Sequence, residues 1–179
     1  KKIKVNPETE IVVTCGAMEG LAAAISSIVD RGDEVIIPSP NYSSHIEQVL
    51  FAEGKPIFVP LIENSGWKLD IDNIKKAITK KTKAIIICNP MNPTGSVFGE
   101  KELREIAKVA LTNNLYIIAD EAYDFLVYDN QSHFSLASMP ELKDNLITTY
   151  SFSKMFCMTG WRVGYLYANE KIVNQVLKV

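Results

Sequence analysis

The stretch Asn145-Leu-Ile-Thr-Thr-Tyr-Ser-Phe-Ser-Lys-Met-Phe-Cys-Met-Thr-Gly-Trp-Arg-Val-Gly-Tyr-Leu-Tyr-Ala168 places two apolar runs on either side of a short polar connection. Residues 145–150 and 163–168 are rich in β-branched and aromatic side chains, and each run predicts a buried strand. The connection between them, residues 151–162, is too short for a crossover helix. The second strand is therefore expected to run antiparallel to the first.

The connection carries two hydroxyls, an amine and a guanidinium, which belong to Ser151, Ser153, Lys154 and Arg162. Hydroxyls beside an arginine suit a phosphate, because the guanidinium fork matches its oxygens. A lysine desolvated near other cations loses its proton more easily and becomes a nucleophile. The combination indicates a phosphorylated aldehyde bound to the lysine as a Schiff base, and pyridoxal phosphate (PLP) is the common biological example. A basic loop with solvated side chains would carry the same residue types, so the stretch alone leaves both interpretations open.

The composition is that of one ordinary globular domain. The chain has 179 residues, 47% of them hydrophobic and 22% charged, and its formal net charge is −2. Without a run of like charges, neither a nucleic acid nor an anionic membrane is expected as a partner. The cysteines at 15, 88 and 157 are far apart and form no CxxC pair, so they predict neither disulfides nor a metal site and favour a cytoplasmic setting. No apolar run approaches the ~20 residues that span a bilayer.

Both ends of the chain look interrupted. It opens on a lysine and stops at Val179, inside an amphipathic run that has no C-cap signal. Residues 1–179 are therefore expected to be an excised or truncated domain of a longer protein.

Short apolar runs alternate with helix-period segments along the whole chain. Several runs are continuous in Val and Ile, which indicates strands buried on both faces. Strands interleaved with helices predict a mostly parallel, seven-stranded α/β sheet with helices on both faces and the last strand antiparallel. The expected strands are residues 10–14, 34–38, 55–60, 82–88, 115–119, 146–150 and 163–168, and the main expected helices are residues 18–30, 42–52, 70–79 and 99–112.

Polar clusters follow the predicted strands, at the edge where such sheets bind ligands. Gly16 allows a close backbone approach, and free amides at the start of a helix favour a phosphate. The two Asn-Pro steps of Asn89-Pro-Met-Asn-Pro-Thr-Gly95 hold the chain extended and would present Asn92 as a fixed donor. Tyr42 could stack on a flat ring, and Asp120 could keep a pyridinium nitrogen protonated. The convergence of these clusters on one edge is a stronger indication of a site than any one of them.

Each cluster also has a simpler interpretation. The glycine turn at 14–20 suits any tight connection from strand to helix, Tyr42 could pack against its own helix, and the Asn-Pro loop could be a structural turn. The strand end Ile117-Ile-Ala-Asp-Glu121 resembles the magnesium arm of a nucleotidase. The chain has neither a GxxxxGK(S/T) loop nor a GxGxxG fingerprint, however, so little supports that alternative.

Three other titratable residues are predicted to be structural. Glu121 should point away from Asp120, because successive side chains of an extended chain alternate. His45 and His133 stand alone in the sequence, without neighbours at ligand spacing, and are expected at the surface or partly buried.

The assembled motifs resemble the central, cofactor-binding domain of the class I and II PLP-dependent aminotransferases, the fold type I group that is similar to aspartate aminotransferase. The resemblance covers essentially the whole chain, and its most specific pieces are residues 89–95, 120–123 and 151–162, in this order and spacing. It implies PLP as the cofactor, an amino acid and a 2-oxo acid as substrates, and a homodimer. It also implies that residues 1–179 are a single PLP-binding large domain, which lacks the family's N-terminal segment and C-terminal small domain. Aspartate and aromatic amino acids are the candidate substrates.

The resemblance also implies a role for each motif residue. Lys154 would form the Schiff base and later carry a proton, and Asp120 would pair with the pyridinium nitrogen. Asn92 and Tyr123 would hydrogen-bond the phenolate oxygen, which makes Tyr123 a catalytic candidate beside Lys154 and Asp120. Tyr42 would stack on the ring. The phosphate would be held by Ser151, Ser153, Arg162 and the backbone amides of Gly16, Ala17 and Met18.

Some positions depart from the family pattern. Met18 stands where a hydroxyl residue is common, so only its backbone amide could serve the phosphate, and Cys157 replaces a smaller residue and is expected to be buried and inert. The arginine that grips the substrate carboxylate in the family has no counterpart here, so the chain alone is expected to turn over poorly or not at all. Other fold type I chemistries share the same cofactor cradle, among them β-lyases, decarboxylases and aminocyclopropane-carboxylate synthases. A non-catalytic PLP sensor, or a domain that binds no cofactor, is a further alternative.

Overall fold

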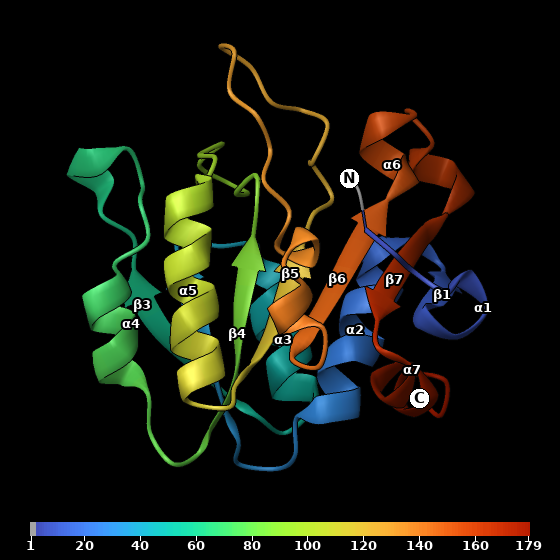
Figure 1. Cartoon of the computed structure of the whole chain (residues 1–179), viewed down its shortest axis with the longest axis horizontal. Helices are drawn as coiled ribbons and strands as arrows, with labels where there is room; N and C mark the ends of the chain where they lie inside the picture. Colours follow the sequence, from blue (N-terminus) through green and yellow to red (C-terminus); the bar gives the residue numbers. More distant parts are fainter. Residues whose placement is uncertain (1–2) are drawn as a thin grey trace.

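Residues 3–179, which the computed structural model describes, build one sheet of seven strands in the order β1-β7-β6-β5-β4-β2-β3 (Figure 1). The strands are β1 (Ile11–Thr14), β2 (Glu34–Ser39), β3 (Lys55–Pro60), β4 (Thr82–Cys88), β5 (Tyr116–Asp120), β6 (Leu146–Ser151) and β7 (Gly164–Ala168). Neighbouring strands run parallel except where β7 pairs with β1 and β6. The predicted fold class is confirmed, and the antiparallel strand lies inside the sheet.

The strands are apolar on both sides because both sides are covered. In β4, Ile85, Ile86 and Ile87 are each at most 1% exposed. Successive side chains of a strand point to opposite faces, and accordingly Ile85 and Ile87 belong to one hydrophobic core while Ile86 belongs to the other. This is why the sequence of β4 is continuous in isoleucine rather than alternating with polar residues.

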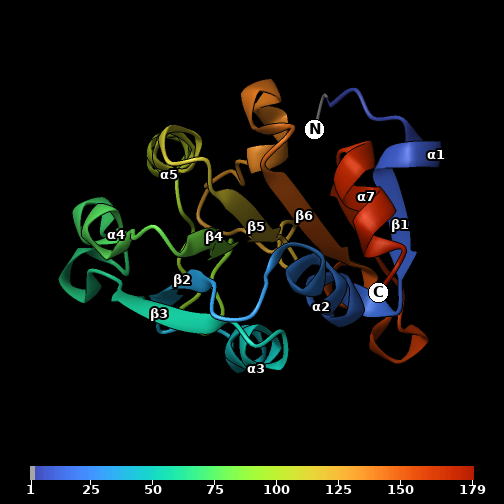
Figure 2. The same ribbon diagram turned by 90° about the horizontal axis from the view of Figure 1, so that it is seen from below.

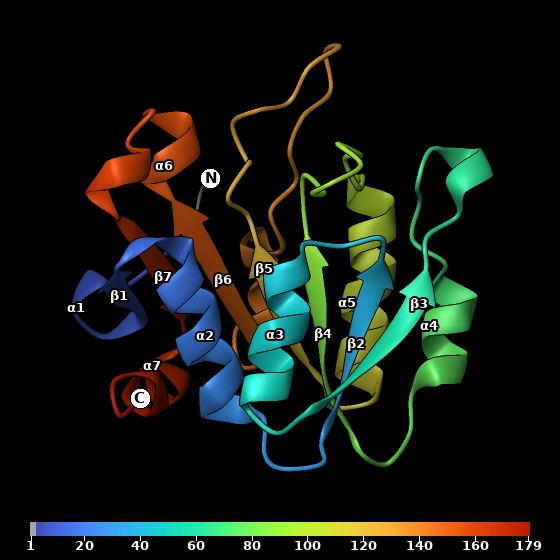
Figure 3. The same ribbon diagram turned by 180° about the vertical axis from the view of Figure 1, so that it is seen from behind.

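Helices cover each face of the sheet, as Figures 2 and 3 show from below and from behind. On one side, α2 (Gly16–Ile28), α3 (Ser43–Phe51) and α7 (Glu170–Val176) enclose one core. On the other, α4 (Ile71–Ala77) and α5 (Glu100–Thr112) enclose the second. The remaining helical segments are short: α1 (Pro7–Glu10), α6 (Phe152–Met155) and the 3-10 turns η1 (Glu63–Ser65), η2 (Leu136–Ser138), η3 (Pro140–Leu142) and η4 (Thr159–Trp161).

The connection from β6 to β7 holds only α6 and η4, so the chain returns beside β6 without crossing the sheet. The carboxyl ends of β2, β4, β5 and β6 lie at one edge of the sheet, uppermost in Figures 1 and 3, and α2 starts on the same side. Helix boundaries differ from the predicted ones by one to two residues at most positions, and α2 begins directly at Gly16. None of the helices formed by residues 3–179 is both long and apolar enough to cross a membrane.

Candidate active site

A cavity of about 410 Å³ opens at the carboxyl edge of the sheet. Its walls come from the segments that follow β1, β2, β4, β5 and β6. This is the expected place for a ligand, because open α/β sheets bind ligands outside the carboxyl ends of their strands. Every predicted site residue except Gly16 lines it, namely Ala17, Met18, Tyr42, Asn92, Asp120, Tyr123, Ser151, Ser153, Lys154 and Arg162. Gly16 lies directly behind, where a β-carbon would come within 2.5 Å of the Arg162 Nη2 atom. The structure brings these residues together, and their individual roles stay predictions.

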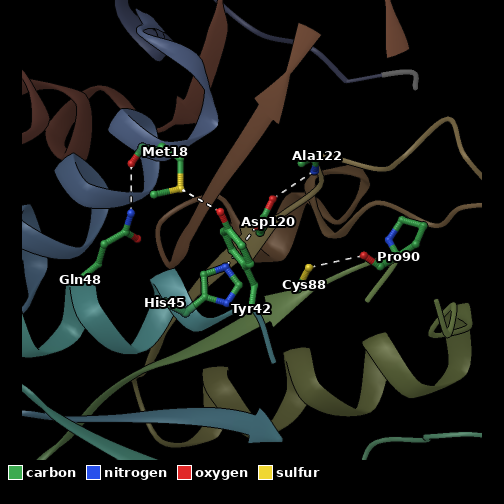
Figure 4. Close-up of polar contacts among 8 residues, drawn as sticks. All are labelled: Met18, Tyr42, His45, Gln48, Cys88, Pro90, Asp120 and Ala122. Atoms are coloured by element: carbon green, nitrogen blue, oxygen red, sulfur yellow. Dashed lines mark hydrogen bonds and ion pairs between the residues drawn. The ribbon is translucent and has the colours of Figure 1, made fainter. Parts of the chain in front are cut away.

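Asp120 ends β5 and is 4% exposed. Its Oδ2 atom lies 3.1 Å from His45 Nε2, and its Oδ1 atom accepts the Ala122 N–H at 3.1 Å (Figure 4). A carboxylate has about four acceptor positions. These two contacts hold the side chain and leave acceptor capacity toward the cavity.

The expectation that His45 is exposed or only partly buried is wrong, because the residue is 1% exposed. His45 belongs to the first turn of α3, and the Tyr42 ring packs edge-on against it with 5.6 Å between centroids. The imidazole thereby reaches Asp120, 75 residues further along the chain. Sequence spacing could not reveal this pair, although the position of His45 one turn after Tyr42 placed it near the site.

Lys154 lies on the single turn of α6, which Ser151 caps by accepting the Ser153 N–H at 3.1 Å. The Lys154 Nζ atom is 5.7 Å from the centre of the Tyr123 ring, within the range of cation–π attraction. Burial raises the pKa of the Tyr123 phenol, and the neighbouring Cys88 and Asp120 side chains add to the shift. The phenol is therefore protonated at neutral pH and able to donate a hydrogen bond.

The part of the cavity wall formed by the start of α2 and by Arg162 is rich in donors. The first amides of α2 point out of a 13-residue helix, whose N-terminus favours an anion. Arg162 donates from Nη1 to the Thr159 carbonyl at 3.1 Å and from Nη2 to the Cys15 carbonyl at 3.4 Å, which holds the guanidinium beside those amides. Thr159 also lines the cavity and was not predicted.

Backbone conformation at this end is specialised. Gly16 has φ +75° and Arg162 has φ +52°, a left-handed value that is uncommon for a residue with a side chain. Non-glycine residues in such conformations cluster at functional sites. Gly164 lets β7 approach α2, since a β-carbon there would lie 2.7 Å from the Ala17 nitrogen.

Both the backbone and the side chain of Met18 accept hydrogen bonds. Its backbone carbonyl accepts from Gln48 Nε2 at 3.2 Å, and its sulfur accepts from the Tyr42 hydroxyl at 3.7 Å (Figure 4). The Met18 side chain thus orients Tyr42 across the cavity, while its amide remains at the start of α2.

The Cys157 expectation is also wrong. The side chain is exposed rather than buried, and the residue has φ +54°. The left-handed turn that follows α6 directs the chain back toward β7 at the surface, where a larger residue finds room.

Glu121, in contrast, matches its prediction: it lies outside the cavity lining, is 3% exposed and accepts from Ser135 Oγ. Within residues 3–179, no group of three or more His, Cys, Asp or Glu side chains is placed to hold a metal ion.

Comparison with known proteins places this geometry in a family. The family model described as "Aminotransferase class I and II" matches residues 1–179. The chain is 42% identical over 176 residues to an aspartate aminotransferase from Pyrococcus abyssi and 39% identical to aromatic-amino-acid aminotransferase 2 from Thermococcus litoralis. In each case the match covers 98% of this chain and 45% of the relative.

Solved structures give the same result. The aromatic aminotransferase from Pyrococcus horikoshii superposes with a TM-score of 0.95 at 40% identity, over 98% of this chain and 47% of that one. N-succinyldiaminopimelate aminotransferase from Mycobacterium tuberculosis superposes with a TM-score of 0.94 at 39% identity, over 97% of this chain and 46% of that one.

The fold is that of the fold type I aminotransferases. Within that class, the chain belongs to the class I and II aminotransferase family. It spans 45% of the length of the curated relatives named above.

Proposed function

We propose that this chain binds PLP in the 410 Å³ cavity and serves an aminotransferase that moves an amino group between an amino acid and a 2-oxo acid. The carrying observation is that one cavity is lined by a buried carboxylate (Asp120), an amine (Lys154) and an anion-binding donor set that includes Arg162. These three features match the ring nitrogen, the aldehyde and the phosphate of PLP. The match is chemical, because each feature has the charge or reactivity that its counterpart requires.

When bound, PLP supplies the aldehyde and the electron-withdrawing ring on which amino transfer takes place. The residues that line the cavity would hold it. The α2 amides, Ser151, Ser153 and Arg162 would bind the phosphate, where the fixed guanidinium adds charge complementarity. Gly16 supports the fit, since a side chain there would push the Arg162 guanidinium away.

The other residues act on the ring and on protons. Asp120, oriented by His45, would hold a proton on the ring nitrogen and keep a positive charge there. Tyr123 and Asn92 would donate to the phenolate oxygen, and Tyr42 would present its aromatic face. The Lys154 amine would hold the cofactor's aldehyde covalently and would serve as the base that takes a proton from the substrate Cα atom.

The proposal extends to substrate, assembly and location. Relatives named for aspartate and for aromatic amino acids make these two classes the first substrates to test. A homodimer is proposed on the family resemblance, and a cytoplasmic setting on the three free cysteines. Turnover is assigned to the longer protein of which this sequence is proposed to be one domain.

The test is covalent labelling. The 179-residue chain is mixed with PLP, reduced with borohydride and digested, and the pyridoxyl adduct is located by peptide mass mapping. We expect the adduct on Lys154 and its loss in Lys154→Ala. Lys101→Ala, which removes an exposed lysine of α5, is the matched control and should label like the unmodified chain. Label spread over surface lysines, or equal labelling of Lys154→Ala, would refute the assignment of the cavity.

A further inference from the structure

Two of the residues that line the cavity, Asn92 and Tyr123, lie on separate loops. Asn92 lies on the loop after β4, and Tyr123 lies on the loop after β5. The second loop, residues 121–135, rises from the sheet edge and projects from the body of the molecule (Figures 1 and 3). Its tip is exposed, with Phe125 at 62% and Tyr128 at 72%. The position of this loop must therefore be set by contacts at its base.

The loop after β4 is closed by Asn89. Its Oδ1 atom accepts the Phe98 N–H at 2.8 Å, and its Nδ2 atom donates to the Phe98 carbonyl at 3.3 Å. Asn89 is 3% exposed and Phe98 is 1% exposed. Because both bonds are buried, breaking them would leave unsatisfied polar groups in the core. Cys88, which precedes Asn89 in the chain, donates its S–H to the Pro90 carbonyl at 3.4 Å and further fixes this turn.

The loop after β5 is closed by Glu121. Both carboxylate oxygens lie within hydrogen-bonding distance of Ser135 Oγ, at 2.7 and 2.9 Å, across fourteen residues of sequence. Glu121 and Ser135 are each 3% exposed. The Tyr150 hydroxyl of β6 also contacts both side chains, so the base of the loop is tied to the strand that precedes Lys154. Burial raises the pKa of this phenol well above its ordinary value, and the Glu121 charge adds to the shift.

His133 connects the two closed loops. Its Nε2 atom lies 3.1 Å from the Asn89 carbonyl oxygen. A carbonyl can only accept, so this ring nitrogen carries a hydrogen and donates. His133 comes two residues before Ser135, and Asn89 begins the Asn-Pro loop. The bond between His133 and Asn89 therefore joins the two loops near their bases.

We propose that Asn89, Glu121 and His133 are positioning residues, which hold the Asn92 loop and the Tyr123 loop in one fixed relation across the cavity. None of the three lines the cavity. Their effect on the ligand would be indirect: they would fix where two donors on different loops meet the same ligand atom, and a donor placed 1 Å away is much less effective. The expected effect on PLP binding rests on the proposed function. The expected effect on the two loops rests only on the contacts described above.

The structural consequence is tested without cofactor, by backbone amide hydrogen exchange of the 179-residue chain. His133→Phe keeps a ring but removes the donor. We expect residues 91–97 and 122–132 to exchange about three- to tenfold faster together, with α5 unchanged. His133→Gln restores a side-chain N–H and should return both loops toward the original rates. Gln131→Ala, an exposed substitution on the same loop, should change neither. Ser135→Ala removes the hydroxyl that contacts Glu121, and it should also raise the exchange rates of residues 122–132.

The functional consequence is tested with PLP. In His133→Phe, the PLP dissociation constant should rise about two- to tenfold, and the pH midpoint of the bound cofactor's visible absorbance should move upward by about half a unit. The midpoint moves upward because weaker donation to the phenolate oxygen makes protonation easier. A general loss of stability would not shift this midpoint, and His133→Gln should restore it.

The outcomes separate this inference from the assignment of the cavity. Faster exchange in the 122–132 segment alone, with residues 91–97 unaffected, would overturn the connection between the loops. So would an unmoved absorbance midpoint in a chain that binds PLP. If the chain does not bind PLP, the exchange result still decides whether the two loops are tied, and the failure then belongs to the proposed function.

Discussion

Gly164→Ala is the most direct probe of how the sheet builds the cavity. Gly164 begins β7 and lies opposite Thr14 of β1 on one side and Ser151 of β6 on the other. A β-carbon at this position would meet the Ala17 nitrogen, the Gly16 carbonyl carbon and the Tyr150 carbonyl oxygen, each at 2.7 Å. Ordinary contact begins at 3.4 Å, so the backbone must yield by about 0.7 Å.

The loss of stability expected for Gly164→Ala depends on which atoms the new β-carbon would contact. All three neighbours are backbone atoms, held by the sheet ladder or by the first turn of α2, and none can rotate aside as a side chain would. Overpacking of this kind costs about 1–3 kcal/mol. For a chain of this size that amounts to a fall in Tm of roughly 2–12 °C. Since α2 is the easier element to move, its amides should shift and PLP affinity should also fall.

Urea unfolding and PLP titration of Gly164→Ala measure the two effects. Gly160→Ala is the matched control, because its β-carbon would have no neighbour within 4 Å and its φ is not in the left-handed region. That substitution should be neutral or stabilising by up to about 1 kcal/mol, through the entropy of the unfolded chain. If Gly164→Ala unfolds within about 0.5 kcal/mol of Gly160→Ala, the close approach of β7 to α2 is not what the structure describes.

Three further predictions concern single contacts. Gly16→Ala adds a β-carbon at φ +75° and against a guanidinium, so it should weaken PLP binding by more than tenfold in a spectroscopic titration; unchanged affinity would contradict the phosphate assignment. His45→Phe removes a buried partner of Asp120 and should lower the free energy of unfolding by about 1–3 kcal/mol in urea, whereas an effect below about 0.5 kcal/mol would mean the pair is not formed. The pKa of the Glu10 carboxyl is lowered from 4.5, chiefly by its hydrogen bond with Lys143. The pair therefore stabilises the fold fully above about pH 4.5, and this stabilisation is lost as the pH falls through the lower folded-state pKa. The difference in unfolding free energy between the unmodified chain and Glu10→Gln should therefore shrink from about pH 7 to about pH 3, and a constant difference would argue against the ion pair.

The placement of residues relative to the strands was within reach of the sequence, because it depends on local order alone. Continuous Val and Ile runs such as residues 82–88 mark buried strands, and polar residues that follow such runs must reach the carboxyl edge if the strands are parallel. That is why Asn92, Asp120 and Lys154, from three different segments, were predicted to meet and do line one cavity. The antiparallel last strand followed from the short connection at 151–162.

Contacts between residues far apart in sequence were decided only by the tertiary structure. His45 looked isolated because its partner Asp120 lies 75 residues away, and only the packing of α3 against the sheet brings them within 3.1 Å. His133 likewise reaches Asn89 across 44 residues. Cys157 was misjudged because exposure depends on the left-handed turn after α6, which residue type alone does not indicate. The sequence by itself determined where the strands lie along the chain and the chemistry at their ends, since both are local properties of the chain. The pairing of the buried polar groups needed the fold, because a hydrogen bond depends on distance in space and the sequence records only distance along the chain.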